Sequence, residues 1–229
     1  MNENIFRRIE QKYLLTEKQK EALLKLIDVY IEKDEYYESE ICNIYFDNDD
    51  NELIVNSLEK PIFKVKLRLR SYEVPNMDSK VFLEVKDKYK GVVGKRREKM
   101  KLSEFYDYYE NNKYKDSQIM KELNYYFKLF KLKPYIFVGY DRKSYYVKNN
   151  RDLRITIDSD LRYRTDNLRL EYGSKGNNYF KDNTYIMEIK ALDGLPLWLT
   201  RVLSELEIYP TSFSKVGNIY KLVRSECVC

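Results

Sequence analysis

The chain contains no histidine, and this absence excludes several kinds of site at once. A histidine-ligated zinc, a Ser-His-Asp triad and a phosphohistidine intermediate are all ruled out. Cysteine is scarce as well, because its 3 residues are too few and too unevenly spaced for a disulfide framework, which favours a reducing, cytoplasmic environment. We interpret Cys42 as a buried thiol in a strand, and Cys227 and Cys229 as part of a flexible tail over 222–229.

Glycine and proline are also rare, with 7 and 5 among 229 residues, so no flexible linker divides the sequence. Together with 43% apolar residues, this predicts one folded domain over 1–229 rather than a disordered chain. No stretch approaches the roughly 18 apolar residues that a membrane-spanning helix needs, and the N-terminus lacks the apolar centre of a signal peptide. A soluble protein that is not secreted is therefore expected.

Hydrophobic periodicity predicts a mixture of strands and helices, the α+β class. Strands are expected at 5–15, 41–47, 62–72, 80–89, 92–102, 134–148, 153–158, 161–164 and 184–192, with a hairpin turn at Lys90-Gly91. Helices are expected from Thr16 to about 34, at 103–112 with Ser103 as cap, at 117–130, and from Pro196 to 207, with a helical turn at 53–58. Mostly hairpin-linked strands favour an antiparallel sheet or barrel.

The strand expected at 62–72 has one strongly cationic face. Its run 64–70 reads KVKLRLR, and alternate side chains of a strand share a face. A solvated strand face usually mixes signs, because adjacent like charges repel each other. Four cations backed by three aliphatic residues are therefore typical of a surface that binds a repeatedly charged anion. The alternative, an ordinary solvated polar face, stays open at this point.

Other strands carry charge with the same alternation. A Glu-x-Lys unit occurs at 10–12, 84–86 and 188–190, and the segment 154–158 places an arginine, a threonine and an aspartate on one face. A barrel whose charged faces share a lumen, and whose apolar faces pack outward against helices, accounts for all of these segments. Burying charges is costly unless they pair or bind a counter-ion, so the excess of cations predicts a polyanionic ligand.

In their order along the chain, these segments resemble the VTC domain, the polyphosphate-polymerising module of vacuolar transporter chaperones. The resemblance runs from about residue 5 to residue 222 and implies the triphosphate tunnel fold, an eight-stranded antiparallel β-barrel with packed helices. It rests on Arg8-x-Glu10-x-Lys12-Tyr13, Ile44-Tyr45-Phe46-Asp47, Lys66-x-Arg68-x-Arg70, Phe82-Leu83-Glu84-x-Lys86, Lys95-Arg96-Arg97, Tyr140-x-Arg142, Arg154-Ile-Thr-Ile-Asp158, Glu188-x-Lys190 and Ser214-Lys215.

The resemblance also implies roles for individual residues. The catalytic phosphate ligands would be Lys12, Arg68, Arg70, Lys86, Arg142 and Arg154. Further phosphate contacts would come from Lys66, Lys95, Arg97, Tyr140, Lys190, Ser214 and Lys215, the last two closing the tunnel from a C-terminal helix. Glu188, with Glu10 and Glu84 as alternatives, would hold a divalent metal, Mn²⁺ or Mg²⁺. Which of the three adjacent cations at 95–97 points into the lumen stays open.

The activity that the resemblance implies is ATP-dependent polyphosphate synthesis, in which the γ-phosphate of ATP is transferred to a growing chain. The related CYTH triphosphatases and adenylyl cyclases begin with Glu-x-Glu-x-Lys, and Arg8 at the first of these positions favours the VTC branch. A metal-dependent tripolyphosphatase or nucleoside triphosphatase, and a non-catalytic polyphosphate-binding module, remain alternatives. Eukaryotic members add an SPX domain and membrane helices that this sequence lacks, which leaves regulation and export to a separate membrane partner, if there is one.

Several remaining features receive simpler interpretations. Tyrosine is spread evenly and no Gly-aromatic RNP signature occurs, so ATP and polyphosphate or triphosphate are expected as partners rather than nucleic acid. We interpret two aspartates as turn caps, two apolar residues of the last helix as core, and three arginines as parts of a solvated loop: Asp158 and Asp160, Trp198 and Leu199, and Arg162, Arg164 and Arg169.

Overall fold

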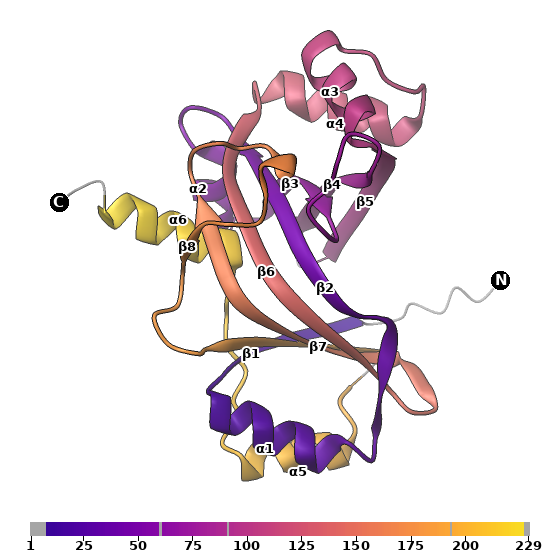
Figure 1. Cartoon of the computed structure of the whole chain (residues 1–229), viewed down its shortest axis with the longest axis vertical. Helices are drawn as coiled ribbons and strands as arrows, with labels where there is room; N and C mark the ends of the chain where they lie inside the picture. Colours follow the sequence, from indigo (N-terminus) through magenta and orange to yellow (C-terminus); the bar gives the residue numbers. More distant parts are fainter. Residues whose placement is uncertain (1–7, 60, 91, 193, 227–229) are drawn as a thin grey trace. The chain divides into compact units, whose positions relative to one another are not determined.

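A computed structural model describes residues 8–59, 61–90, 92–192 and 194–226 (Figure 1). The predicted α+β class is confirmed, because strands and helices both occur throughout this part of the chain. The elements are β1 (Arg8–Leu15), α1 (Glu17–Ile27), β2 (Ile31–Asp47), α2 (Glu52–Leu58), β3 (Phe63–Ser71), β4 (Lys80–Tyr89), β5 (Val92–Lys101), α3 (Leu102–Asn111), α4 (Gln118–Leu129), β6 (Lys133–Val147), β7 (Asn150–Arg164), a 3₁₀ turn (Leu170–Tyr172), β8 (Asn177–Asn178), β9 (Tyr185–Leu192), α5 (Leu197–Glu205) and α6 (Lys215–Glu226).

The strands form one nine-stranded sheet in the order β1-β9-β7-β6-β2-β3-β4-β5, with β8 paired to β7. The pairs whose registers are resolved are antiparallel, as predicted. Within the described residues β1 and β5 end the strand order and do not pair, so the prediction of a closed barrel is wrong. The edge strand β5 is rich in lysine and arginine, and such charges are a common feature of strands that remain unpaired on one side.

Contacts divide the chain into two compact units. Unit 1 consists of Met1–Ser39, Tyr140–Leu161 and Phe180–Phe213, and unit 2 of Glu40–Gly139, Arg162–Tyr179 and Ser214–Cys229. Strands β2, β6 and β7 each contribute residues to both units, so the chain passes from one to the other within regular structure. This fits a sequence with few glycines and prolines.

The core of unit 1 joins the apolar faces of β1, β7 and β9 to helices α1 and α5, which lie side by side (Figure 1). Leu23 of α1 and Leu199 of α5 are both fully buried in this core. The predicted capping box begins α1, because the Thr16 hydroxyl accepts the backbone N–H of Gln19 and the Gln19 side chain accepts that of Thr16. The core shared by these strands and helices confirms the predicted packing of strands against helices in this unit.

The helix predicted to continue to about residue 34 ends instead at Ile27, and β2 occupies 17 residues from Ile31 onward. Most residues of 31–40 are charged or tyrosine and at least partly exposed, so they show no apolar alternation that would have predicted a strand. Tyr30, which lies between the end of α1 and the start of β2, stacks on Trp198 with ring centroids 4.2 Å apart.

The core of unit 2 lies between the sheet and helices α3 and α4, which lie beside β4 and β5 (Figure 1). The apolar faces of β3 and β4, with residues such as Leu67 and Leu83 fully buried, pack under aromatic residues such as Phe105 and Phe127. Cys42 of β2 is also fully buried, as predicted, and burial raises the pKa of its thiol to about 12.

Three further boundaries differ from the predictions. The α3 helix has Lys101 rather than Ser103 at its N-cap, and the carboxylate of Glu104 accepts the Lys101 N–H at 2.7 Å. Strand β7 is continuous across the two short strands predicted at 153–158 and 161–164, with a positive φ of 48° at Asp160. Helix α6 extends to Glu226, so residues 222–226 are not a tail.

The predictions for residues 5–7, Gly91, Cys227 and Cys229 lie outside the described residues. Among the helices that the structure describes, none combines the length and the apolar character needed to cross a bilayer.

Candidate functional site

Unit 2 presents a strongly cationic sheet face, because alternate side chains of three neighbouring strands are lysine or arginine. The strand registers place Arg68 opposite Glu84 and Glu84 opposite Arg97, so the three strands share this face. Glu84 is the only acidic side chain on it within the described residues of β3, β4 and β5. We define the cationic face as Lys64, Lys66, Arg68, Arg70, Lys86, Lys88, Lys95, Arg97 and Lys99.

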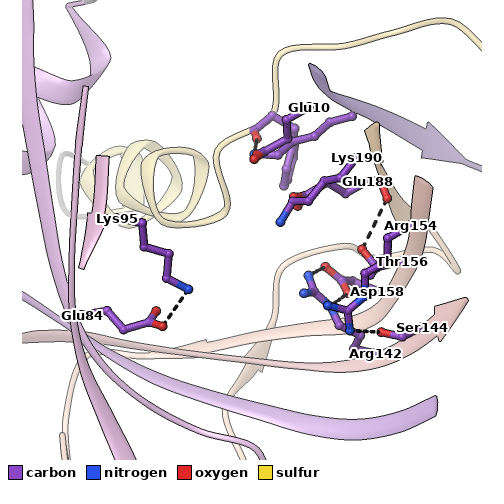
Figure 2. Close-up of polar contacts among 12 residues, drawn as sticks. Glu10, Glu84, Lys95, Arg142, Ser144, Arg154, Thr156, Asp158, Glu188 and Lys190 are labelled. Atoms are coloured by element: carbon purple, nitrogen blue, oxygen red, sulfur yellow. Dashed lines mark hydrogen bonds and ion pairs between the residues drawn. The ribbon is translucent and has the colours of Figure 1, made fainter. Parts of the chain in front are cut away.

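Glu84 lies at the centre of this face and is only 1% exposed. Its Oε2 accepts from the Arg68 guanidinium at 2.7–2.8 Å, and its Oε1 lies 2.8 Å from Lys95 Nζ (Figure 2). Burial would raise the pKa of Glu84, but Arg68, Arg70 and Lys95 outweigh burial and lower that pKa to about 2. Glu84 is therefore ionised at neutral pH and orders its cationic neighbours. Because both of its oxygens already contact cations, Glu84 is a weaker candidate for a metal ligand.

Two β2 side chains that were not among the predicted site residues hold the arginines of β3. Arg68 donates to the Tyr45 hydroxyl at 3.1 Å, and Arg70 donates to the side-chain oxygen of Asn43 at 2.9 Å. Asn43, which is fully buried, also donates to the Val138 carbonyl at 2.9 Å. Polar residues at 43 and 45, alternating with apolar ones at 42, 44 and 46, were the available signal.

Tyr45 is itself affected by the cations around it. Burial raises the pKa of a phenol, but Arg68 and Arg70 act in the opposite direction and lower the pKa of Tyr45 to about 8. The positive charge of this part of the face is therefore strong enough to stabilise an anion in a half-buried position.

The residue at the start of the last helix also contributes to unit 2's site. Lys66 Nζ donates to the Ser214 hydroxyl at 3.1 Å, and the next residue, Lys215, begins α6. Helix α6 packs closely on α2: a Cβ at Gly217 would lie 2.9 Å from a methyl group of Leu58. Ser214 thus lies beside Lys66, one of the lysines predicted to bind phosphate.

The three adjacent cations of β5 point in two directions. Arg97 lies on the cationic face, with its guanidinium 4.8 Å from the centroid of the Phe82 ring. Arg96 lies on the opposite face, where it forms ion pairs with Asp87 at 2.8 Å and with Glu122 of α4. Lys95 and Arg97 therefore share the cationic face, whereas Arg96 joins α4 to the opposite face of the sheet. That Lys95 and Arg97 point into a lumen stays a prediction.

Unit 1 contains a second group of charged side chains, which is balanced in sign. The registers pair Lys12 with Glu188, Glu10 with Lys190, and Arg154 with Lys190, so these residues share one sheet face. We define the mixed-charge cluster as Glu10, Lys12, Asp34, Arg142, Arg154, Asp158, Glu188 and Lys190, with four cations and four carboxylates.

Glu188 is the one carboxylate of β9, and 8% of its surface is exposed. It forms an ion pair with Lys190 on the same strand face at 2.9 Å (Figure 2). Burial raises the pKa of Glu188, but Lys190, Lys12 and Arg142 outweigh it and hold the pKa well below its usual range. Lys12 in turn lies 3.7 Å from Glu10 and donates to the Phe213 carbonyl at 3.2 Å.

Two arginines predicted as phosphate ligands form strong ion pairs within unit 1. Arg142 binds Asp158 through two hydrogen bonds of 2.6 and 2.8 Å, and Asp158 is 1% exposed (Figure 2). Arg154 donates to Asp34 at 2.6 Å and to Ser144 at 3.3 Å. The interpretation of Asp158 as a turn cap is therefore wrong, because this aspartate lies inside β7 and is the counter-ion of Arg142. The ring centroid of Tyr140, which was also predicted in the site, lies 5.3 Å from Cζ of the Arg142 guanidinium.

The three arginines at 162–169 are held by other parts of unit 2. Arg162 lies 3.6 Å from Glu40, and Arg169 donates to Glu171 at 2.7 Å. Arg164 donates to four backbone carbonyls of the segment 167–175 at 2.8–3.2 Å. The interpretation of these arginines as parts of a solvated loop is therefore wrong for Arg162 and Arg164, which lie in β7 and are partly buried.

A divalent metal fits unit 1 only in a restricted way. Glu10 and Glu188 lie on the same face of adjacent strands, but no group of three acidic or sulfur ligands occurs among the described residues. Mg²⁺ commonly takes one or two carboxylates and completes its shell with substrate phosphate and water. The donor set therefore fits a metal that arrives with a phosphate ligand.

The predicted site residues thus gather in two groups, one in each unit. The cationic face and its neighbours hold Lys66, Arg68, Arg70, Glu84, Lys86, Lys95, Arg97, Ser214 and Lys215, and the mixed-charge cluster and its neighbours hold Glu10, Lys12, Tyr140, Arg142, Arg154, Glu188 and Lys190. The convergence of both groups on one lumen stays a prediction. A cavity of about 430 Å³ is lined by residues of β5, α3, α4 and the loop between the two helices, and none of the predicted site residues is among them.

Comparison with solved structures finds a similar fold in other proteins. A candidate adenylate cyclase from Bacillus halodurans is similar in structure, with a TM-score of 0.56, 14% sequence identity, and 90% of this chain and 93% of that chain covered. Two further structures resemble this chain more distantly. One is a candidate adenylate cyclase from Vibrio parahaemolyticus, with a TM-score of 0.48, 10% identity, and 93% of this chain and 97% of that chain covered. The other is the PH1819 protein from Pyrococcus horikoshii, with a TM-score of 0.49, 14% identity, and 94% of this chain and 99% of that chain covered.

The sequence profile of the VTC domain matches residues 7–224, nearly the whole chain. The chain therefore belongs to the VTC domain family, as the ordered motifs predicted. Comparison with curated proteins finds no match.

Proposed function

We propose that the chain is a phosphotransferase that extends polyphosphate with the γ-phosphate of ATP. The observation that carries this proposal is the cationic face of unit 2, where nine lysines and arginines surround one carboxylate, Glu84. So many like charges on adjacent strands repel each other, and a polyanion would relieve that repulsion. A phosphate chain, with charge repeated along its length, matches the repeated cations better than a single carboxylate or sulfate would.

The binding groups are held in place before a ligand arrives. Arg68 is oriented by Glu84 and Tyr45, and Arg70 by Asn43, so each guanidinium is held in a fixed direction. Phosphoryl transfer depends mainly on positioning and charge neutralisation, and fixed guanidinium groups supply both. No histidine or other covalent carrier is required.

The reaction that we propose is a direct in-line transfer. A terminal oxygen of the polyphosphate chain forms a bond to the γ-phosphorus of ATP, and the bond from that phosphorus to the β,γ-bridging oxygen breaks. The electron pair of the broken bond leaves with ADP, and the chain becomes one phosphate longer. Lysines and arginines that contact the equatorial oxygens stabilise the charge of the transition state.

We assign the metal-binding role to Glu188, with Glu10 as its neighbour on β1. Mn²⁺ or Mg²⁺ bound there would neutralise charge on the phosphate oxygens during transfer. Within unit 1, Lys190 and Lys12 keep Glu188 ionised, which is the protonation state that a metal ligand needs.

A non-catalytic polyphosphate-binding module is the second candidate. It is favoured by the fact that Glu84 and Glu188 already form ion pairs with Lys95 and Lys190, at 2.8 and 2.9 Å. A metal would have to compete with those lysines. The cationic face would bind polyphosphate equally well in either case.

Incubation of the protein with ATP and Mn²⁺, followed by gel separation and polyphosphate staining, tests these assignments. Long chains together with ADP support the polymerase. Release of orthophosphate without chains identifies a hydrolase, and unchanged ATP with retained polyphosphate binding identifies the binding module. Absence of both binding and turnover would overturn the proposal as a whole.

A further inference from the structure

One end of the β3–β4–β5 sheet in unit 2 exposes a group of large apolar side chains. Val92 is 74% exposed and Ile62 is 68% exposed, values that a soluble protein rarely gives to clustered aliphatic residues. We define the hairpin tip as Ile62, Phe63, Tyr89, Val92 and Val93.

The strand registers show that this group is contiguous. Phe63 is paired with Tyr89, and Tyr89 with Val92 across the hairpin. The Ile62 carbonyl accepts the Lys90 N–H at 2.9 Å, which ties the start of β3 to the turn. The five residues therefore lie together at one end of the three strands rather than at scattered exposed positions.

The hairpin tip is apolar on both faces of the sheet. Phe63, Tyr89 and Val92 continue the face that α3 and α4 cover farther along, because they share the alternation of Val65 and Val85. Val93 lies opposite Lys88, on the cationic face. A flat protein partner covers one side of a sheet, whereas a fluid bilayer interface can surround both.

Lysines flank these apolar side chains. Lys64 and Lys88 are paired directly across β3 and β4, and Lys90 follows Tyr89 in the turn. The nearest acidic side chain on these strands, Asp87, is engaged by Arg96 at 2.8 Å. The tip thus combines exposed apolar groups with the positive charges of Lys88 and Lys90.

We propose that the hairpin tip docks unit 2 on an anionic lipid surface. The apolar side chains would enter the boundary between headgroups and acyl chains, and Lys88 and Lys90 would contact anionic headgroups. Five apolar side chains at the end of a hairpin are enough to lie in this boundary and far too few to span a bilayer. Because Lys88 also belongs to the cationic face, the apolar side chains are the part of this docking surface that is separate from the activity assigned to the site.

Co-sedimentation of the full chain with vesicles tests the proposal. We expect binding to vesicles of three parts phosphatidylcholine to one part phosphatidylserine, and weak or no binding to phosphatidylcholine alone. The variant Ile62→Gln with Val92→Gln should lose most of this binding. Its control, Tyr125→Gln with Leu129→Gln, removes two exposed apolar residues of α4 without changing charge and should bind like wild type.

A second pair of variants tests the lysines. Lys88→Gln with Lys90→Gln should weaken vesicle binding by about 10-fold or more, since each lysine near an anionic surface contributes about 1 kcal/mol. Lys113→Gln with Lys115→Gln carries the same charge change in the loop before α4 and should have little effect. Circular dichroism of each variant verifies that it is folded.

Three outcomes would overturn the proposal. The first is a wild-type chain that ignores anionic vesicles. The second is wild-type binding by Ile62→Gln with Val92→Gln, because this would mean that the cationic face alone adheres to the lipid. The third is a wild-type chain that self-associates without binding lipid, together with loss of this self-association in Ile62→Gln with Val92→Gln. The tip would then be a contact between two copies of the chain.

Discussion

The carboxylate of Glu84 receives the Arg68 guanidinium at 2.7 Å and Lys95 at 2.8 Å, on a sheet face that is otherwise cationic. One buried acid therefore orients cations contributed by two neighbouring strands. It also removes part of the positive charge that a phosphate ligand would meet. Stability of unit 2 and affinity for a polyanion are coupled through this residue.

Glu84→Gln should destabilise the protein at neutral pH by about 3 kcal/mol, because the pKa of Glu84 falls from 4.5 to about 2 on folding. Because its pKa is lowered on folding, Glu84 stabilises the folded state fully at pH values above 4.5, the pKa of the unfolded state. This stabilisation is lost as the pH falls toward 2. Urea unfolding at several pH values measures the effect. The variant should show a smaller loss of stability across that window than wild type, and parallel curves for both proteins would contradict the assignment.

Arg97→Gln and Arg96→Gln form a matched pair, since the two residues are adjacent and each substitution removes one positive charge. Arg97 lies on the cationic face, so its loss should weaken tripolyphosphate binding by about 10-fold or more. Arg96→Gln should leave affinity near the wild-type value and lower stability instead, because Asp87 and Glu122 lose their partner. Calorimetry measures the affinities. Equal weakening by both variants would show that only net charge matters.

Glu188→Gln should abolish Mn²⁺-dependent turnover of ATP while tripolyphosphate still binds in the absence of metal. Glutamine keeps the size of the side chain but loses the charge that a metal ligand needs. Glu38→Gln is the control, because Glu38 belongs to the same unit and forms only an exposed pair with Lys143 at 3.4 Å. Full Mn²⁺-dependent activity in Glu188→Gln would direct the search to Glu10 and then to Glu84.

Tyr45 offers a direct spectroscopic readout of ligand binding. Arg68 and Arg70 lower its pKa from 10.0 to about 8 by stabilising the phenolate. A phosphate chain bound to those arginines would offset their charge, so saturation with tripolyphosphate should raise the pKa of Tyr45 back toward 10.0. Ultraviolet titration of wild type and Tyr45→Phe isolates this group. A phenolate transition that tripolyphosphate leaves in place would mean that the ligand binds elsewhere.

The sequence predicted features that depend on local periodicity. The run 64–70 alternates strictly, so the sharing of one face by its cations followed from strand geometry alone. The capping box at Thr16 and Gln19 was equally visible, because its two hydrogen bonds join residues three positions apart.

Features that depend on distant partners were not predictable in this way. Arg154 binds Asp34, which lies 120 positions earlier in a part of β2 without apolar alternation. Closure of the sheet depends on whether β1 and β5 pair, and no pattern within either strand encodes that pairing. Asp158 had been placed on the same strand face as Arg154, but only the structure reveals its contact with Arg142.

The four backbone carbonyls that converge on Arg164 give the segment 167–175 an unusual kind of order. Apart from three short-range backbone hydrogen bonds, this loop is held by one side chain and has no long ladder of independent bonds that can fray from its ends. It should open as a single event, and its amides should exchange with solvent water at closely similar rates. Lysine at this position would keep the charge but not the planar fork of donors, so conservation of charge alone would not preserve the loop.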